Sequence, residues 1–187
     1  GIHPEYSPDY ARIINEHHFN RLIHYINKEK VYFGGKSKKD SLYIGPTILH
    51  NISLQDPVMQ EEIFGPILPV LTFKTLSDTT SIINTNPKPL ALYYFGQSKS
   101  RMNYLKHRVS FGGGCINDTI MHVASNRLPF GGVGDSGIGS YHGKASFDTF
   151  THYKSILNKS TAIDIPFRYP PYKRKLSLMR KIVNHLL

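Results

Sequence analysis

Residues 67–117 have the sequence ILPVLTFKTLSDTTSIINTNPKPLALYYFGQSKSRMNYLKHRVSFGGGCIN. Three apolar runs within this stretch, at 67–73, 90–95 and 113–117, predict three strands. The first two runs are almost continuously apolar, which is typical of strands that are covered on both faces of a sheet.

Two helices are predicted between these strands. Ser77 can cap a short helix after the first strand, and residues 99–109 suit a helix with Met102 and Leu105 facing inward. The order strand, helix, strand, helix, strand requires crossover connections, which are nearly always right-handed. The stretch therefore predicts an α/β fold with a parallel sheet.

The segments before residue 67 predict one helix and two strands. Asn15 is a candidate N-cap, because its side-chain oxygen can accept a hydrogen bond from a free amide of the first turn. Strands are predicted at 31–33 and 43–49, the second one broken by Gly45 and Pro46. Apolar residues at helical spacing predict one helix face, made of Phe19, Leu22, Ile23 and Ile26.

Beyond Asn117 the alternation of helices and strands is lost. Six glycines fall between residues 128 and 143, where they permit tight turns and close approach of other atoms. Residues 148–158 predict one more strand, with Phe150, Tyr153 and Ile156 as apolar anchors. A basic amphipathic helix is predicted at the end of the chain from Leu176, Met179, Ile182, Val183, Leu186 and Leu187.

The composition is that of a globular protein with a basic surface. Of 187 residues, 40% are hydrophobic and 19% are charged, which excludes the composition typical of disorder. The net charge is +10, but the basic residues form no stripe interleaved with aromatic residues, so a nucleic-acid partner is not expected. The single cysteine excludes an internal disulfide and a cysteine-based zinc site. The ten histidines show no metal-ligand spacing, so no metal is expected.

The sequence shows no targeting signal that would direct it out of the cytoplasm. No run approaches about 18 apolar residues and no signal peptide opens the chain, so we expect a cytoplasmic protein. The basic terminal helix could lie on an anionic membrane, which would make the protein peripheral to that membrane, or it could dock on its own domain. Because the first residue is Gly1 rather than methionine, we expect a processed or cut piece.

Five motifs together resemble the C-terminal part of an aldehyde dehydrogenase of the class 3 type. They are SPDYARIIN at 7–15, QEEIFGP at 60–66, PLALY at 89–93, PFGGVGDSG at 129–137 and YHGKASFDTF at 141–150. EEIFGP and PFGG mark the superfamily, whereas SPDY and YHGK point to the class 3 branch. Because the order and spacing of the motifs agree with the family, the resemblance covers essentially the whole chain.

This resemblance implies a fold and a division of the chain. The fold would be a three-layer α/β arrangement around a parallel sheet, an incomplete catalytic domain with a C-terminal oligomerisation strand and a terminal helix. Residues 1–145 would form the partial catalytic domain, residues 146–160 the oligomerisation strand and residues 161–187 the basic tail. The family's N-terminal NAD(P)-binding domain, its general-base glutamate and its nucleophilic cysteine would all lie upstream.

The resemblance also implies an activity for the complete enzyme. It would oxidise an aldehyde to a carboxylic acid with NAD or NADP, beginning with attack of the upstream cysteine on the carbonyl group. The present chain would carry no catalytic residue, so we expect it to be inactive when isolated.

Glu62 and Phe64 would be cofactor residues by the same resemblance. The glutamate would accept hydrogen bonds from the hydroxyls of the nicotinamide ribose, because a carboxylate offers only acceptors. The phenylalanine would pack near the nicotinamide, and Gly65 and Pro66 would turn the chain sharply after it. From composition alone, Glu62 would instead be a solvated loop carboxylate and Phe64 a core anchor.

The aldehyde pocket would be lined from the region after Asn117. Ile120, Val123 and Ala124 match wall positions of class 3 relatives, and His142 matches a position at the pocket edge. Small and aliphatic walls admit an apolar substrate. A hydrophobic loop anchor explains the first three equally well, and a lone histidine is more often a hydrogen-bonded structural residue.

Cys115 and Asn117 allow other interpretations. Cys115 could be a thiol nucleophile with His122 or His142 as its base. Its position matches the strand before the family's glycine-rich loop, not the nucleophile motif, so a small core residue is favoured over a cysteine hydrolase. Asn117 follows a strand, where ligands approach parallel sheets, and the resemblance gives it a bracing role.

Two partners are implied for the complete enzyme. One is the aldehyde substrate, and the other is a second subunit, because residues 148–158 match the arm that pairs across the family's homodimer. A non-catalytic module for subunit pairing or for weak membrane-surface contact through residues 172–187 is the alternative.

Overall fold

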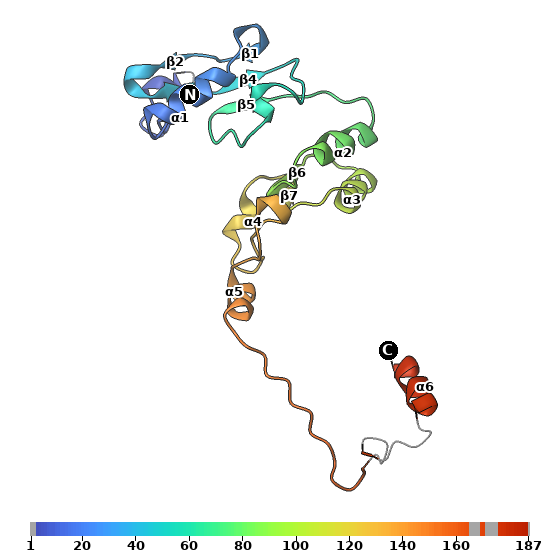
Figure 1. Cartoon of the computed structure of the whole chain (residues 1–187). Coiled ribbons are helices and arrows are strands. Elements are labelled where there is room, and N and C mark those ends of the chain that lie inside the picture. Colours follow the sequence, from blue (N-terminus) through green and yellow to red (C-terminus); the bar gives the residue numbers. More distant parts are fainter. Residues whose placement is uncertain (1–2, 165–168, 171–175, 187) are drawn as a thin grey trace. The chain divides into compact units, whose positions relative to one another are not determined.

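The structure is a computed structural model that describes residues 3–164, 169–170 and 176–186 (Figure 1). It contains two compact units, residues 1–149 and residues 150–187, and each is described by itself. The strands of the described part of the chain all belong to the first unit.

The first unit alternates helices and strands. Its α-helices are α1 (Glu16–Tyr25), α2 (Leu76–Thr85), α3 (Lys99–Arg108), α4 (Met121–Ala124) and α5 (Gly143–Thr149). Its strands are β1 (Val31–Phe33), β2 (Ser37–Lys38), β3 (Tyr43–Ile44), β4 (Thr47–Leu49), β5 (Ile67–Pro69), β6 (Ala91–Tyr94) and β7 (Gly113–Ile116). Short 3-10 helices are η1 (Pro4–Tyr6), η2 (Lys28–Lys30), η3 (Lys39–Ser41), η4 (Pro57–Met59) and η5 (Gly134–Ser136).

Helix α1 forms where the sequence predicts a helix. Asn15 is its N-cap, and the Asn15 side chain accepts a hydrogen bond from the His18 amide at 2.9 Å. The apolar face of α1 packs on residues from the neighbouring strands and from η4. The resulting core consists of Phe19, Leu22, Tyr25, Ile44, Leu49, Val58 and Ile67.

Two small sheets surround this core. Strand β4 lies between β1, to which it is antiparallel, and β5, to which it is parallel, while β2 and β3 form an antiparallel pair. The predicted break at Gly45 and Pro46 is confirmed, since it separates β3 from β4. The chain crosses itself closely here: a Cβ at Gly34 would lie 1.9 Å from the Pro46 carbonyl oxygen, so this crossing requires glycine.

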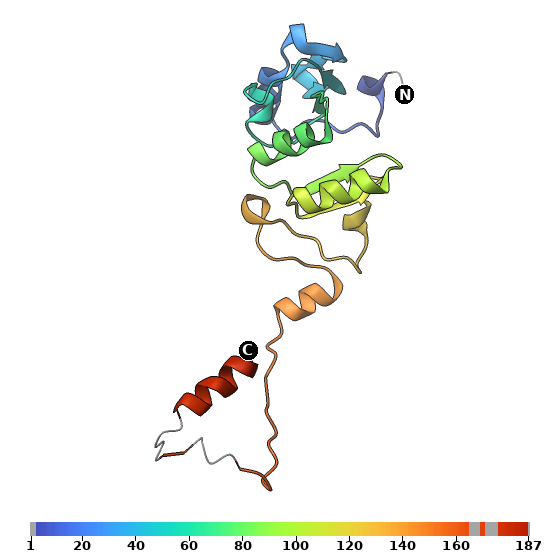
Figure 2. The same ribbon diagram turned by 90° about the vertical axis from the view of Figure 1, so that its right-hand side faces the viewer.

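Strands β6 and β7 form a parallel pair, and helix α3 is the connection between them (Figure 2). The register places Leu92 opposite Gly114. Leu105 of α3 is buried, and Met102 lines a pocket together with Leu92, so both helix residues face the strands as predicted. The α/β class is therefore confirmed, with sheets that are mixed rather than purely parallel.

Three details of this region correct the prediction. The three apolar runs do not form one sheet, because β5 pairs with β4 whereas β6 pairs with β7. Strand β5 ends at Pro69 rather than at Phe73, because its partner β4 ends at Leu49 and the Val70 amide makes the last hydrogen bond to that strand. Helix α2 is capped by Thr75 instead of Ser77, because Thr75 and Asp78 form a reciprocal capping box.

The predicted strand at 148–158 is also corrected. Asp148 and Thr149 complete helix α5, where Asp148 forms an ion pair with Lys144 one turn earlier. Residues 151–160 have no regular secondary structure. A strand needs a neighbouring strand for its backbone hydrogen bonds, and none of the sheets in the described part of the chain includes this segment.

The second unit confirms the predicted terminal helix, α6 (Leu176–Leu186). Its described apolar side chains are all more than a third exposed, namely Leu176, Leu178, Met179, Ile182 and Val183. Leu187, the side chain of Leu186 and the basic run at 173–175 lie outside the described residues.

Candidate functional site

A loop at residues 60–66, between η4 and β5, carries both predicted cofactor residues. Phe64 has a positive φ of 46° and is 84% exposed, so its ring is outside the core. The composition-based alternative, in which Phe64 anchors the core, is therefore wrong. Glu62 is exposed as well, and it enters the hydrogen bonds of the described residues through its backbone carbonyl rather than its carboxylate.

The guanidinium of Arg21, in helix α1, binds the backbone of this loop. Its Nη1 donates to the Glu62 carbonyl oxygen at 3.2 Å, and its Nη2 donates to the Ile63 carbonyl oxygen at 2.8 Å. The two accepting carbonyls are those of the residues immediately before Phe64. The backbone between Glu62 and Phe64 is thus fixed to a helix while both side chains remain exposed.

Two further side chains hold the Arg21 guanidinium in place. Its Nη1 donates to the Tyr25 hydroxyl at 3.1 Å and lies 3.6 Å from Glu61 Oε1. The Tyr25 hydroxyl donates to the same carboxylate oxygen. This hydrogen bond and the adjacent Arg21 charge lower the pKa of Glu61, whereas burial and the Glu61 contact raise the pKa of Tyr25. At neutral pH the network is therefore a carboxylate, a neutral phenol and a guanidinium.

Gly65 allows the loop to lie directly on α1. A Cβ at this position would lie 2.7 Å from both methyl carbons of Leu22, which is fully buried. On the far side, the Pro66 carbonyl oxygen accepts a hydrogen bond from the Thr47 amide at 2.9 Å. On the near side, the Gln60 side chain donates to the Leu54 carbonyl oxygen at 2.6 Å. The loop is fixed at its two ends and at its centre.

The predicted pocket residues lie in a different segment of the first unit. Ile120 immediately precedes α4, has a positive φ of 66° and is 65% exposed, which does not suit a loop anchor. Val123 is half-buried and Ala124 is exposed. In the described part of the chain, no hydrogen bond, ion pair or ring contact joins this segment to the loop at 60–66.

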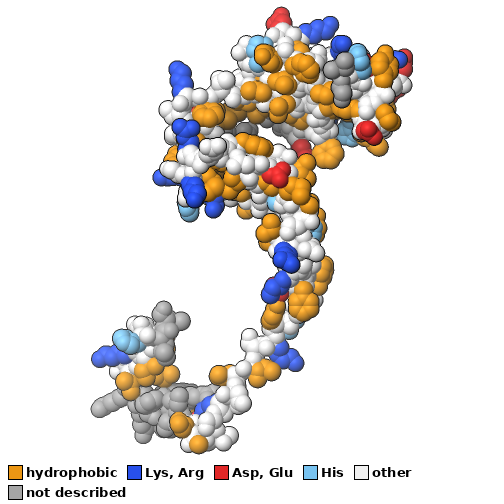
Figure 3. Space-filling model, turned by 180° about the vertical axis from the view of Figure 1, so that it is seen from behind, with side chains coloured by type: hydrophobic (Ala, Val, Ile, Leu, Met, Phe, Trp, Pro, Cys, Tyr) orange, Lys and Arg blue, Asp and Glu red, His pale blue; other side chains and the backbone are white. Residues whose placement is uncertain are grey.

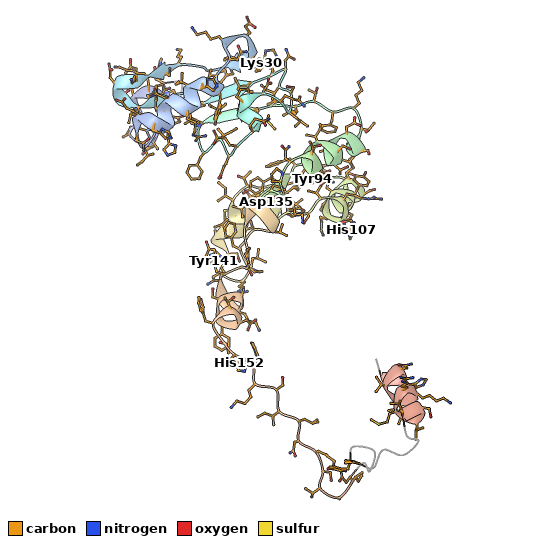
Figure 4. The ribbon with its side chains drawn as sticks, in the orientation of Figure 1. Lys30, Tyr94, His107, Asp135, Tyr141 and His152 are labelled. Atoms are coloured by element: carbon orange, nitrogen blue, oxygen red, sulfur yellow. The ribbon has the colours of Figure 1, made fainter. Side chains whose placement is uncertain are left out.

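An aromatic cluster joins His142 to helix α4. The ring of His142 stacks on Phe130 with the centroids 6.2 Å apart, and His122 of α4 packs on Phe130 at 5.5 Å. Tyr141, labelled in Figure 4, contacts both Phe130 and His142 edge-on. The Nδ1 atom of His142 is buried and has no hydrogen-bond partner among the described residues, whereas its amide donates to Ser146 Oγ.

Asn117 braces the loops that follow β6 and β7. Its Oδ1 accepts a hydrogen bond from the Gly96 amide at 2.7 Å, and its Nδ2 donates to the Gly96 carbonyl oxygen at 3.2 Å. Its own amide donates to the Tyr94 carbonyl oxygen at 2.7 Å. With φ at 57°, a conformation that asparagine tolerates well, the residue has the bracing role expected for it.

Cys115 lies within β7 and is half-buried. Its Sγ is 3.5 Å from Nδ1 of His122, so the structure brings together the thiol and one of the two histidines weighed as its base. The His122 ring is 7% exposed and is packed between Tyr93 and Phe130. Because its imidazole is enclosed by aromatic rings, His122 fits a packing role better than the role of a base. The cysteine hydrolase therefore stays the weaker alternative.

Sequence reasoning missed Arg21 and Tyr25. Their i, i+4 spacing places them on the same side of α1. Their partners, however, are 36 to 42 residues further along the chain. No local sequence pattern indicates that a side chain will contact a distant backbone carbonyl.

Comparison with known proteins decides the family. Residues 4–156 match the model of the aldehyde dehydrogenase family. This chain belongs to the aldehyde dehydrogenase family. It is 48% identical over 182 residues to the 4,4'-diaponeurosporen-aldehyde dehydrogenase of Staphylococcus aureus, with 96% of this chain and 40% of that relative covered. It is 44% identical to aldehyde dehydrogenase family 3 member H1 of Arabidopsis thaliana, with 98% of this chain and 39% of that relative covered.

Solved structures agree with the fold of this aldehyde dehydrogenase chain. The substrate-bound state of Staphylococcus aureus AldH matches with a TM-score of 0.82 and 46% identity, over 96% of this chain and 40% of that one. An indole-3-acetaldehyde dehydrogenase in complex with NAD+ matches with a TM-score of 0.69 and 28% identity, over 78% of this chain and 30% of that one. The chain thus spans 40% of the length of the Staphylococcus aureus relative, and similar shares of the others.

Two features are absent from the described residues. No helix in this part of the aldehyde dehydrogenase chain is long and apolar enough to span a bilayer. The same residues contain no group of three or more His, Cys, Asp or Glu side chains placed to hold a metal ion.

Proposed function

We propose that this chain is the C-terminal part of a class 3 aldehyde dehydrogenase that oxidises aldehydes to carboxylic acids with NAD or NADP. The observation that carries the proposal is the loop at 60–66, whose backbone is fixed to α1 while the Glu62 carboxylate and the Phe64 ring are exposed. Related proteins support both cofactors: a Mus musculus relative, 46% identical, is named NADP-preferring, and the indole-3-acetaldehyde dehydrogenase was solved with NAD+.

The exposed residues of the loop fit the nicotinamide end of the cofactor. The Glu62 carboxylate offers only acceptors, which suits the two hydroxyls of a ribose. The Phe64 ring offers a flat apolar surface next to it. When bound, NAD or NADP supplies the hydride acceptor. The chain's own contribution is orientation, because a loop that is already fixed loses little conformational entropy when it binds a ligand.

The wall of the aldehyde pocket would come from residues 120–124 and from His142. Ile120, Val123 and Ala124 would line it with apolar surface, and His142 would stand at its edge, where Phe130 fixes the orientation of the imidazole. Apolar walls exclude water and favour an apolar aldehyde.

The nucleophile and the general base would lie in an upstream part of the enzyme, so the isolated chain would be inactive. Many large apolar side chains of the first unit are exposed, as the orange surface in Figure 3 shows. On and near β5, β6 and β7 they are Leu68, Val70, Phe73, Phe95 and Ile116, all more than 40% exposed. Large apolar side chains exposed in this number are typical of an interface, and the rest of the enzyme would cover them.

The segment after α5 would pair with a second copy of the enzyme. Phe150, Ile156 and Leu157 are each at least 79% exposed, and the segment has no strand beside it in the described residues. Strand addition across a homodimer would bury these side chains and supply the missing ladder. A cytoplasmic location and a weak contact of α6 with a membrane surface stay predictions.

The experiment that tests the proposed function uses a chimaera in which the upstream part of the Staphylococcus aureus relative is joined to this chain. In the chimaera, Glu62→Gln should raise the KM for NAD(P) about 10-fold or more, because a charged acceptor of hydrogen bonds is lost. The KM for the aldehyde should not change. Steady-state formation of NAD(P)H measures both constants.

The matched control is Glu29→Gln, which neutralises an exposed glutamate elsewhere in the first unit. It should leave both constants as they are. Equal cofactor KM values for Glu62→Gln and the unsubstituted chimaera would contradict the role given to the loop.

A further inference from the structure

We propose that Arg21 is a positioning residue for the cofactor, which acts by fixing the backbone on both sides of Ile63 and thereby aiming Glu62 and Phe64. The inference rests on the proposed function of the loop at 60–66. Arg21 itself is remote from the cofactor in this account, since its guanidinium faces the loop's carbonyl groups and its side chain is only 19% exposed.

The guanidinium of Arg21 binds two consecutive peptide groups of the loop. Nη1 binds the Glu62 carbonyl oxygen at 3.2 Å and Nη2 binds the Ile63 carbonyl oxygen at 2.8 Å. The first carbonyl belongs to the residue whose carboxylate would bind the ribose, and the second belongs to the peptide bond that leads into Phe64. Rotation of either peptide group would redirect one of the two side chains.

The conformation of Phe64 needs such support. Its φ of 46° is in the left-handed region, which is unfavourable for a residue with a Cβ. A strained backbone of this kind persists only where the surroundings determine it. The Arg21 hydrogen bond to the preceding carbonyl and the close packing of Gly65 on Leu22 hold Phe64 in this conformation.

The Arg21 guanidinium is itself held rigidly, because Tyr25 and Glu61 both fix its orientation. The guanidinium carbon lies 5.5 Å from the centre of the Tyr25 ring, and the Tyr25 hydroxyl accepts a hydrogen bond from Nη1 at 3.1 Å. The Glu61 carboxylate pairs with Arg21 and accepts a hydrogen bond from Tyr25. Helix, arginine, tyrosine, glutamate and loop therefore form a closed network.

Lysine cannot replace arginine here. A guanidinium presents several N–H groups in a planar fork, whereas an ammonium is a point charge that cannot hold two carbonyls in one fixed geometry. Arg21→Lys keeps the charge beside Glu61 and most of the aliphatic stem, so it removes the fork without removing the ion pair. It is the variant that separates positioning from charge.

The chain contains a matched control. Arg12 also binds two backbone carbonyls, those of Tyr10 at 2.7 Å and Glu5 at 2.6 Å. It also lies over a tyrosine ring, 5.1 Å from the centre of Tyr43. The two carbonyls are in the segment before α1 and Tyr43 is in β3, so none of these partners belongs to the loop at 60–66. Arg12→Lys therefore makes the same chemical change with no connection to the cofactor loop.

The test measures steady-state constants of the chimaera with each variant. We expect Arg21→Lys to raise the KM for NAD(P) about 10-fold and to leave the KM for the aldehyde unchanged, because a displaced ribose acceptor affects only the cofactor. Tyr25→Phe, which removes one support of the guanidinium, should shift the cofactor KM in the same direction by a smaller factor. Arg12→Lys should leave both constants unchanged.

The other outcomes have distinct meanings. If Glu62→Gln raises the cofactor KM and Arg21→Lys does not, the positioning role of Arg21 is overturned and the proposed function of the loop stands. If neither variant changes it, the proposed function of the loop fails as well. If Arg21→Lys raises both constants together, or if Arg12→Lys has the same effect, Arg21 is only a structural residue and the inference is wrong.

Hydrogen exchange on the isolated full chain gives a second readout that needs no activity. In Arg21→Lys, exchange at the amides of Thr47 and Ile67, which donate to the Pro66 and Gly65 carbonyl oxygens of the loop, should become at least about 10-fold faster, while the amides of β6 and β7 keep their rates. Unchanged exchange at Thr47 and Ile67 would overturn the proposal, because the loop would then keep its conformation without the fork.

Discussion

Replacing Leu22 by alanine is expected to lower the free energy of unfolding of the first unit by about 2–5 kcal/mol. Leu22 is completely buried, and it packs against the core residues of α1, β3, β4 and η4. Its methyl groups also fill the space beside Gly65, so the cavity would open directly under the loop at 60–66. Urea denaturation of the full chain, followed by circular dichroism, measures the change.

Leu68→Ala provides the matched control for Leu22→Ala. Leu68 belongs to β5 of the same region, but its side chain is 58% exposed in this chain. Its truncation should cost less than about 1 kcal/mol, since little buried surface is lost. Equal costs for the two leucines would show that α1 does not form the core described above.

Gly114→Ala is expected to disrupt the β6–β7 pair, with a cost of about 3 kcal/mol or more. In the parallel register Gly114 lies opposite Leu92, and a Cβ on Gly114 would be 2.0 Å from the Leu92 carbonyl oxygen. That neighbour is backbone and cannot rotate away, so the strands would have to separate. Hydrogen exchange at the amides of β6 and β7, together with urea denaturation, measures the loss.

Cys115→Ala is the control in the same strand. It removes the contact between the thiol and His122 but adds no atom between the strands, so the ladder should persist. A fully protected β6–β7 ladder in Gly114→Ala would contradict the close backbone approach at this pair, because the observed geometry leaves no room for a Cβ on Gly114.

The sequence predicts the elements whose causes are local. Asn15 at the start of an apolar helical pattern is sufficient for α1, and the run from Ala91 to Ile116 contains both strands and the helix of the parallel unit. The break at Gly45 and Pro46 was equally visible. The capping box of α2 is local as well, since Asp78 stands three residues after Thr75, and the prediction of Ser77 as the cap is wrong.

Features that depend on distant partners were not predictable in the same way. The apolar run from Ile67 to Phe73 does not reveal that its ladder partner is β4, nor that the pairing stops at Pro69 because β4 ends at Leu49. The segment after Thr149 has apolar residues at intervals typical of a strand, but a ladder requires a neighbour. The candidate site shows the same division: Glu62 and Phe64 stand in a motif, whereas Arg21 acts across 41 residues.

The most direct test of the central claim is aldehyde-dependent reduction of NAD and NADP, with aliphatic and aromatic aldehydes. The assay compares the isolated chain with the chimaera that carries the upstream part of the Staphylococcus aureus relative, each with and without Cys115→Ala. We expect no turnover by the isolated chain, and turnover by the chimaera that Cys115→Ala leaves unchanged. Turnover by the isolated chain that disappears with Cys115→Ala would contradict the account, because Cys115 and His122 would then be the active site.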